Sequence, residues 1–366
     1  MKVAFISRAT SFTSEGGDTR QLQETAAALR ILGVDVDIQL ADQAIDYRPY
    51  DLLHFFNIIR PADIIRHVRL SGKPYVVSPI FVEYTEVPAE SRSRLAAAFE
   101  RTVSENVVEY AKTLARAWRN GERIVSREYV LWGHARSIAF VARHARMLLP
   151  NSESEYARFA ANYPAATAHR VVPNGIRAAL VTAEYPSCER YHDAVICMAR
   201  IEGRKNQLNL IRALNGTPYR LFLHGAPSPN HQAYYDRCRR EAGPNVHIGE
   251  RLDDRALFTA YANARVHVLP SYFETTGLSS LEAAAMKCNI VVTARGDTRE
   301  YFQDHAWYCD PDSPASIRAA VEAAYQAPPN PRLVARILDR YTWSRAAAAT
   351  RDAYEVVLQQ ESACTA

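Results

Sequence analysis

The chain has 366 residues, of which 48% are hydrophobic and 23% charged, and its formal net charge at pH 7 is +4. These proportions are typical of a folded globular protein and exclude fibrous and intrinsically disordered classes. The length exceeds what one hydrophobic core usually serves, so we expect two domains. The small positive charge gives no reason to expect a nucleic-acid partner.

The cysteines indicate neither a zinc site nor a disulfide framework, because the six of them include no C-x-x-C pair. We expect reduced thiols in a cytoplasmic protein. The apolar run at the N-terminus is too short for a signal peptide and is interpreted as a first strand. No run of about 18 apolar residues occurs, so we expect no membrane-spanning helix and at most peripheral membrane contact.

The first half opens with an apolar strand at 3–7, a loop with Gly16 and Gly17, and a helix from about 18 to 32. This order is the beginning of a βαβ unit, and adjacent glycines allow backbone amides to approach a ligand closely. A plain tight turn before the helix is the alternative. The two glycines do not fit G-x-G-x-x-G, so the dinucleotide-binding fingerprint is absent.

Further apolar runs alternate with helical segments and favour an α/β fold with parallel sheets covered on both faces. His54 lies inside one run and is interpreted as a core histidine. The segment 89–146 is helical in composition, rich in arginine, and carries Trp118 and Trp132. Such a segment can lie on an anionic membrane surface, or it can be a solvated basic face over an ordinary core.

A second alternating series predicts a second doubly wound α/β half. Its strands are expected at 194–198, 219–224, 246–248, 266–269 and 290–293. The polar segment 178–192 is interpreted as the linker. We therefore expect an N-terminal domain at 1–180 and a C-terminal domain at 190–341.

The segment 270–294 carries the most informative motif of the chain. Glu274 and Glu282 stand on either side of a turn at Gly277, with seven residues between them. The structural interpretation makes Ser279 and Glu282 a capping box and Glu274 a solvated loop acid. The functional interpretation places both acids at the carboxyl end of a strand, where open parallel sheets bind ligands.

Charged or glycine residues also follow three other strands of this half, namely Arg200 with Lys205, Gly225, and Arg251. Two cations together with helix N-termini suit a diphosphate, because they stabilise its negative charge. Carboxylates suit hydroxyl groups of a ribose or a hexose. A nucleotide-sugar contains both parts.

Several motifs together resemble the retaining glycosyltransferases of family 4, which have the GT-B fold. They are ARIEGRKNQ at 199–207, FETTGLSSLEAAAMKCNIVVT at 273–293, the turn at Gly225, the Gly16-Gly17 loop and the PNG turn at 173–175. The resemblance implies two Rossmann-like domains that face each other across a cleft. It also implies that residues 342–366 cross back and pack onto the N-terminal, acceptor-binding domain, while the C-terminal domain binds the donor.

The resemblance also implies roles for single residues. Glu282 would hold the ribose hydroxyls, Glu274 would contact the donor sugar, and Arg200 and Lys205 would bind the diphosphate without a metal or other cofactor. The remaining donor-binding candidates are Gly277, Leu278, Ser279, Gly16, Gly17, Gly225 and Arg251.

One feature departs from the family. Many members have a histidine after the strand that corresponds to 75–80, whereas this chain has no histidine between His67 and His134. On the acceptor side its role would fall to Glu83, to Tyr84 or to a backbone group, or it would be absent.

The expected activity is transfer of a hexose, with retention at the anomeric carbon, from a nucleotide-sugar to a glycan or lipid-linked acceptor in cell-surface polysaccharide assembly. GDP-mannose is the first choice of donor and a UDP-hexose the second. A sugar-nucleotide 2-epimerase and a non-catalytic nucleotide-sugar or membrane-binding module are the alternatives. The presence of all four charged site residues argues against the non-catalytic module.

Overall fold

The computed structural model describes residues 1–13, 16–82, 110, 126–164, 167–228 and 231–365. Two compact units account for these residues. The N-terminal unit contains residues 1–81, the described part of 95–174, and residues 343–365. The C-terminal unit contains Val82 and residues 175–342, including the whole of 178–192.

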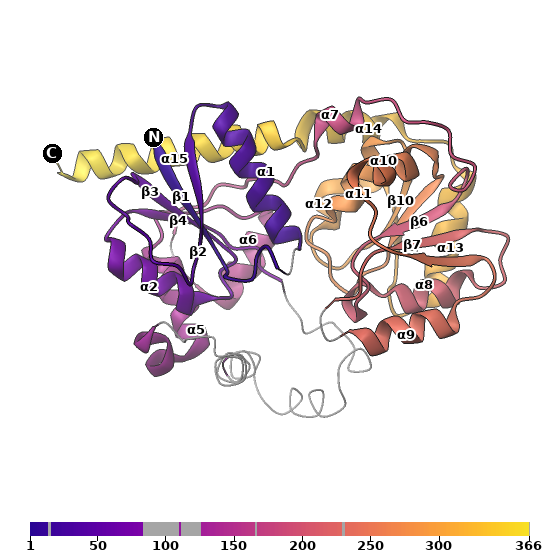
Figure 1. Cartoon of the computed structure of the whole chain (residues 1–366), viewed down its shortest axis with the longest axis horizontal. Helices are drawn as coiled ribbons and strands as arrows, with labels where there is room; N and C mark the ends of the chain where they lie inside the picture. Colours follow the sequence, from indigo (N-terminus) through magenta and orange to yellow (C-terminus); the bar gives the residue numbers. More distant parts are fainter. Residues whose placement is uncertain (14–15, 83–109, 111–125, 165–166, 229–230, 366) are drawn as a thin grey trace. The chain divides into compact units, whose positions relative to one another are not determined.

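The N-terminal unit is built on five parallel strands in the order β2-β1-β3-β4-β5 (Figure 1). The chain forms β2 on one side of β1 and β3 on the other, so its direction along the sheet reverses between β1 and β3. The strands are β1 (Lys2–Ser7), β2 (Asp35–Leu40), β3 (Leu52–Phe56), β4 (Tyr75–Ser78) and β5 (Met147–Leu148). The helices are α1 (Gly17–Ile31), α2 (Pro61–Ser71), α5 (Arg127–His144), α6 (Glu153–Asn162) and α15 (Trp343–Thr365).

The central strands of this unit are buried almost throughout, as expected for a parallel sheet with both faces covered. Helix α15 packs against α1 and so joins the core of the N-terminal unit. His54 is confirmed as a core histidine: its Nδ1 lies 2.6 Å from the hydroxyl of Tyr354 on α15, and its Nε2 lies 2.9 Å from the hydroxyl of Ser78.

The C-terminal unit has six parallel strands in the order β11-β10-β9-β6-β7-β8, the order of a dinucleotide-binding Rossmann sheet. Its strands are β6 (Val195–Met198), β7 (Leu221–His224), β8 (Val246–Gly249), β9 (Val266–Leu269), β10 (Asn289–Thr293) and β11 (Trp307–Cys309). Its helices of five or more residues are α8 (Gln207–Leu214), α9 (Gln232–Glu241), α10 (Asp254–Asn263), α11 (Leu278–Ala285), α12 (Thr298–Phe302), α13 (Pro314–Gln326) and α14 (Pro331–Arg340). The prediction of two doubly wound α/β units is confirmed.

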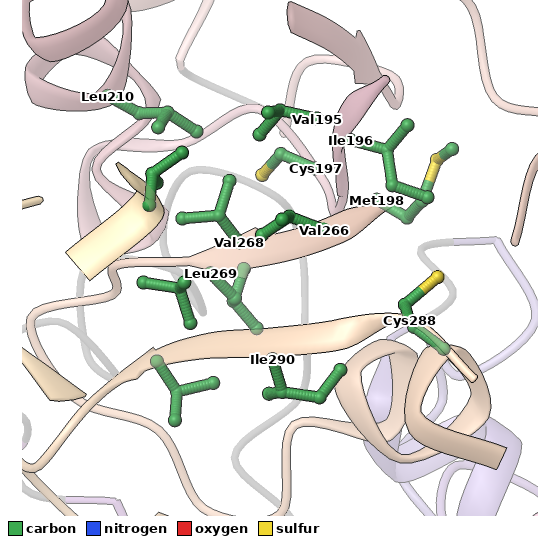
Figure 2. Close-up of a cluster of buried hydrophobic side chains, with 14 of the residues drawn as sticks. Val195, Ile196, Cys197, Met198, Leu210, Val266, Val268, Leu269, Cys288 and Ile290 are labelled. Carbon is green, nitrogen blue, oxygen red and sulfur yellow. The ribbon is translucent and has the colours of Figure 1, made fainter. Parts of the chain in front are cut away.

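The core of the C-terminal unit is assembled from strands far apart in the sequence (Figure 2). Side chains of β6, β9 and β10 pack together there, with Leu210 of α8 and Cys288, the residue before β10. Burial of aliphatic surface of this kind contributes about 25 cal/mol for each Å² removed from water. The core therefore fixes the six strands relative to one another. The loops that follow these strands are attached to a rigid sheet.

Most of the basic segment 89–146, including Trp118, lies outside the described residues. Its described end is α5, which is not a continuous helix, because Gly133 has φ 77° and ψ 179° and divides it. In the part of the chain that the structure describes, no helix combines the length and apolar character needed to cross a membrane.

Candidate active site

The candidate site of the C-terminal unit lies at the carboxyl ends of β6 and β9. These two strands are neighbours, and the chain reverses its direction along the sheet between them. In open α/β sheets this reversal is where ligands bind. The loop after β6 carries Arg200 and Lys205, and the loop after β9 carries Glu274. The fold therefore brings the two predicted motifs to one place.

Lys205 and Glu274 form a buried ion pair, with Nζ and Oε2 2.5 Å apart and side chains that are 13% and 6% exposed. The hydroxyl of Ser271 donates to the same carboxylate oxygen at 3.0 Å. Burial alone would raise the pKa of Glu274, but Lys205 and the nearby Arg204 lower it below its usual value. The structural interpretation of Glu274 as a solvated loop acid is thus wrong.

Glu202 is paired with the two other cations of the site, Arg200 and Arg204. One of its oxygens lies 3.4 Å from the guanidinium of Arg200 and the other 3.2 Å from that of Arg204. The hydroxyl of Ser228, after β7, donates to it at 2.5 Å. Burial opposes ionisation, yet Arg204, Arg200, Lys205 and this hydrogen bond lower the pKa of Glu202 to about 2. Glu202 is therefore ionised at neutral pH.

Glu202 and Arg204 were not among the residues singled out from the sequence. Arg204 also donates to the carbonyl of Phe273 at 3.2 Å, and its own carbonyl accepts from the amide of Tyr272. It therefore connects the loop after β6 to the residue beside Glu274. The available signal was the alternation of charges in RIEGRK directly after a buried strand, which places three cations and one acid in six residues.

The main chain of Glu274 is held by the loop after β10. Its amide donates to the carbonyl of Arg295 at 3.2 Å, and its carbonyl accepts from the amide of Asp297 at 2.9 Å. Gly296 lies between these two contacts with φ +93°, and a Cβ there would lie 2.1 Å from the Glu274 carbonyl oxygen. Only glycine fits this position.

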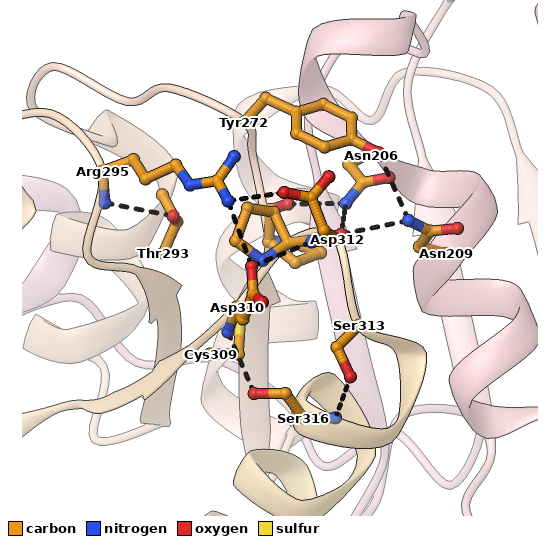
Figure 3. Close-up of polar contacts among 12 residues, drawn as sticks. Asn206, Asn209, Tyr272, Thr293, Arg295, Cys309, Asp310, Asp312, Ser313 and Ser316 are labelled. Atoms are coloured by element: carbon orange, nitrogen blue, oxygen red, sulfur yellow. Dashed lines mark hydrogen bonds and ion pairs between the residues drawn. The ribbon is translucent and has the colours of Figure 1, made fainter. Parts of the chain in front are cut away.

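Polar side chains connect the loops after β6, β9 and β11 (Figure 3). The amide nitrogen of Asn206 donates to the carbonyls of Pro270 and Pro311 at 3.0 and 2.7 Å, and that of Asn209 donates to Pro311 at 3.0 Å. Arg295, after β10, pairs with Asp310 at 3.1 Å and with Asp312 at 2.5 Å. These contacts fix the loops that present Lys205 and Glu274.

Glu282 lies on α11, and the structure corrects the account of its cap. The N-cap is Gly277, with φ 68° and no side-chain cap, so Ser279 is the second residue of the helix and no capping box forms with Glu282. Glu282 is half-buried, and its Oε1 lies 3.9 Å from a guanidinium nitrogen of Arg177. Arg177 in turn forms two hydrogen bonds with Asp254. Leu278 and Ser279 are the first two residues of α11.

Two further residues predicted to bind the donor, Gly225 and Arg251, follow β7 and β8. A Cβ at Gly225 would lie 1.9 Å from the Ala199 carbonyl oxygen, so close packing of the loops after β6 and β7 already explains this glycine. Arg251 is exposed beyond β8, at the same edge of the sheet.

Gly16 and Gly17 stand at the start of α1 in the N-terminal unit. The backbone at Gly16 is extended, with φ −141°, and a Cβ at Gly17 would meet nothing within 4 Å. The local fold therefore gives no reason for glycine at Gly17. Glu83 and Tyr84 lie outside the described residues.

Comparison with known proteins agrees with this geometry. Residues 192–336 match the family "Glycosyl transferases group 1". A serotype-specific mannosyltransferase, WbdA of Escherichia coli, is 27% identical over 222 residues, which are 57% of this chain and 26% of WbdA. The chain thus matches about a quarter of the length of this curated relative.

Solved structures resemble the whole chain. Sucrose-phosphate synthase from Thermosynechococcus elongatus aligns with a TM-score of 0.72 and 15% identity, over 98% of this chain and 100% of its own. Anabaena Alr3699/HepE, solved in complex with UDP-glucose, aligns with a TM-score of 0.63 and 14% identity over 100% of both chains. At these identities the likeness establishes the fold. The chain therefore has the GT-B fold, and its residues 192–336 match the group 1 glycosyltransferase domain.

Proposed function

We propose that the protein is a retaining, metal-independent hexosyltransferase that moves a hexose from a nucleotide-sugar to a hydroxyl of a glycan or lipid-linked acceptor in cell-surface polysaccharide assembly. The observation that carries the proposal is the cluster of Arg200, Arg204, Lys205, Glu202 and Glu274 at the strand reversal of the C-terminal sheet. Three cations and two carboxylates leave one net positive charge in a partly buried site. This balance suits a diphosphate joined to a sugar.

In the proposed reaction the bond between the anomeric carbon and the diphosphate oxygen breaks, and negative charge grows on the leaving nucleoside diphosphate. Arg200 has the most exposed side chain of the three cations, at 40%, and is assigned to the diphosphate together with Lys205. The first-turn amides of Leu278 and Ser279 would add hydrogen bonds at the N-terminus of α11. Fixed positive groups that stabilise growing charge are a major source of rate enhancement, and here they would act in place of a metal ion.

Glu274 is assigned to the hydroxyls of the donor sugar. Its carboxylate is ionised and accepts hydrogen bonds, while its pairing with Lys205 limits its use as a general base. The acceptor hydroxyl would therefore attack the anomeric carbon on the face from which the diphosphate leaves. A phosphate oxygen of the leaving group would take the acceptor proton, so the configuration is retained without an enzymic nucleophile.

The relatives support the choice of substrates. WbdA is a mannosyltransferase, which favours mannose, with GDP-mannose as the first donor to test. The HepE complex contains UDP-glucose, which keeps UDP-hexoses as the second choice. For the N-terminal unit we propose acceptor binding and peripheral contact with anionic lipid at the inner face of the membrane. Exposed Val130 and Leu131 on α5, beside Arg127, support this contact.

The test is turnover of GDP-mannose, UDP-glucose and UDP-galactose by the purified protein, with and without a lipid-linked glycan acceptor, in the presence of EDTA. We expect one donor to be consumed and the product to keep the anomeric configuration of the donor by NMR. Appearance of an isomerised nucleotide-sugar without acceptor would establish the epimerase instead. Loss of turnover in EDTA that returns with Mg²⁺ would contradict metal independence.

Membrane contact is tested separately by co-sedimentation with phosphatidylglycerol-containing vesicles at low salt. Pelleting of the wild type, together with reduced pelleting of Leu131→Ser, is expected. No pelleting of the wild type would remove this part of the proposal.

A further inference from the structure

His267 is a polar residue in the middle of the C-terminal sheet. It lies on β9, is fully buried, and is paired with Ile196 of β6 and Ile290 of β10. Its Nε2 has no hydrogen-bond partner among the residues that the structure describes. The same holds for the hydroxyl of Tyr261, whose ring centroid is 6.0 Å from that of His267. A buried polar atom without a partner lowers stability, so packing alone does not explain a histidine at this position.

The other ring nitrogen of His267 connects the strand to α11. Its Nδ1 lies 3.4 Å from the hydroxyl of Ser280, a long hydrogen bond. Ser280 is the third residue of α11 and is fully buried, and its amide donates to the carbonyl of Gly277 at 2.8 Å. Burial lowers the pKa of His267 to about 3, so the ring is neutral at neutral pH. His267 therefore holds the first turn of α11 against β9 without placing a charge there.

The turn before α11 packs against the side chain of Glu274. A Cβ at Gly277 would lie 3.4 Å from Cγ of Glu274 and 3.5 Å from Oγ of Ser280. Both side chains are therefore on the same side of this turn and close to its main chain. Lys205 holds the carboxylate of Glu274, whereas the turn at Gly277 supports the aliphatic part of the side chain. A shift of the first turn of α11 would therefore shift Glu274.

We propose that His267 is a positioning residue for the transfer reaction. Through Ser280 it fixes the turn at Gly277, and this turn fixes the side chain of Glu274. The inference rests on the proposed function, in which Glu274 contacts the donor sugar. It gives a role to a strand residue that touches no substrate. It also explains why the chain has a histidine where an apolar side chain would leave no buried nitrogen without a partner.

The first variant to test is His267→Phe in the full chain, which keeps an aromatic ring and removes both nitrogens. The donor is whichever of GDP-mannose, UDP-glucose and UDP-galactose the wild type consumes. We expect kcat to fall about 10-fold, because small displacements of a group that contacts the reacting sugar reduce the rate strongly. The affinity for the matching nucleoside diphosphate, GDP or UDP, should stay within about 2-fold by calorimetry, since Glu274 is assigned to the sugar. The thermal midpoint should stay within about 4 °C of the wild type.

Matched variants separate positioning from packing. The side-chain amide of asparagine lies where Nδ1 of a histidine would lie, and that of glutamine lies where Nε2 would lie. His267→Asn should therefore keep more of kcat than His267→Gln, although its smaller side chain leaves a larger cavity and costs more stability. Ser280→Ala removes the other half of the contact and should lower kcat as His267→Phe does. The double variant His267→Phe/Ser280→Ala should be no slower than either single variant.

Three results would overturn the inference. They are a wild-type kcat in His267→Phe or Ser280→Ala, a kcat that falls in step with thermal stability across the variants, and an equal loss of kcat and nucleoside diphosphate affinity. Where a variant of His267 does not fold, Ser280→Ala decides by the same two measurements. A wild type that consumes none of the three donors would overturn the proposed function itself. An active wild type with an equally active His267→Phe would overturn only the inference.

Discussion

Lys205 and Glu274 are assigned to donor binding, and the ion pair between them is also part of the structure of the C-terminal unit. Both side chains are almost fully buried, and they lie 2.5 Å apart. Removing one partner of a buried ion pair leaves an uncompensated charge and destabilises a protein by about 3–5 kcal/mol. A loss of activity on substitution therefore has two possible origins here, and an experiment must separate them.

Glu274→Ala and Lys205→Ala should each abolish transfer and also lower the free energy of unfolding by about 3 kcal/mol. Activity assays and urea denaturation measure the two effects. The double variant Lys205→Met/Glu274→Gln provides the control, because it leaves no buried charge unpaired. We expect it to recover much of the stability and none of the activity. Turnover close to wild type in the double variant would contradict the site assignment.

At this scale the sequence identified the acids but not their surroundings. Glu274 and Glu282 were visible because their spacing around Gly277 is read directly from the chain. The hydrogen bond from Ser228 to Glu202 and the contact of Arg177 with Glu282 join residues that are distant in sequence. No local pattern encodes such pairs. The Ser279 capping box was wrong for a related reason: Gly277 in the left-handed region already starts the helix.

At the scale of elements, the loop after β10 is the support of the site. Its three residues 295–297 hold the main chain of Glu274 through two hydrogen bonds, and Gly296 allows the close approach. The sequence predicted β9 and β10 on either side of the motif but gave no role to this loop. A glycine in a short polar loop is compatible with any turn, and only the neighbouring strand end shows why it is needed.

Gly296→Ala should reduce transfer by at least 100-fold, because a Cβ 2.1 Å from the Glu274 carbonyl oxygen must displace that residue. Gly216→Ala is the matched control. Gly216 also has a positive φ, +70°, but a Cβ there would meet nothing within 4 Å. It should cost about 1 kcal/mol of stability from backbone strain and leave kcat unchanged. Steady-state kinetics and thermal melts distinguish the two variants, and equal activity in both would contradict the role of the loop.

The helices and strands that the sequence predicted best are those whose residues are buried along most of their length. Strands β1, β3, β6, β9 and β10 were recognised from their apolar runs. Helix α9 and strand β11 were not predicted, since α9 has one fully buried side chain, Cys238, and β11 has only three residues. Periodicity is informative only when enough side chains of an element face the core.

At the scale of the whole molecule, both units bury histidines that remain neutral. Burial lowers the pKa of His54 in the N-terminal unit and of His267 in the C-terminal unit to about 3, from the usual 6.5. Below pH 6.5 the unfolded chain binds protons at these positions that the native protein does not bind. Stability is therefore fully present above pH 6.5 and is lost as the pH falls towards 3.

Urea denaturation at pH 7.5 and pH 5.5 tests this effect. One pH unit below the pKa of histidine in the unfolded chain, each of these two histidines should lower the free energy of unfolding by about 1.4 kcal/mol. The side chain of His54→Gln can still form hydrogen bonds but does not titrate. This variant should therefore remove the contribution of His54 to the pH dependence of the free energy of unfolding. A free energy of unfolding that does not change between the two pH values would contradict the neutral state of both rings.

The hydrogen bond between His54 and Tyr354 joins residues separated by 300 positions. During synthesis on the ribosome, β3 emerges before its partner on α15, which is made 300 residues later. Part of the core of the nascent N-terminal unit therefore stays uncovered while the entire C-terminal unit is translated. We expect chaperones to bind stalled chains that end before residue 343 and to release them once α15 has emerged.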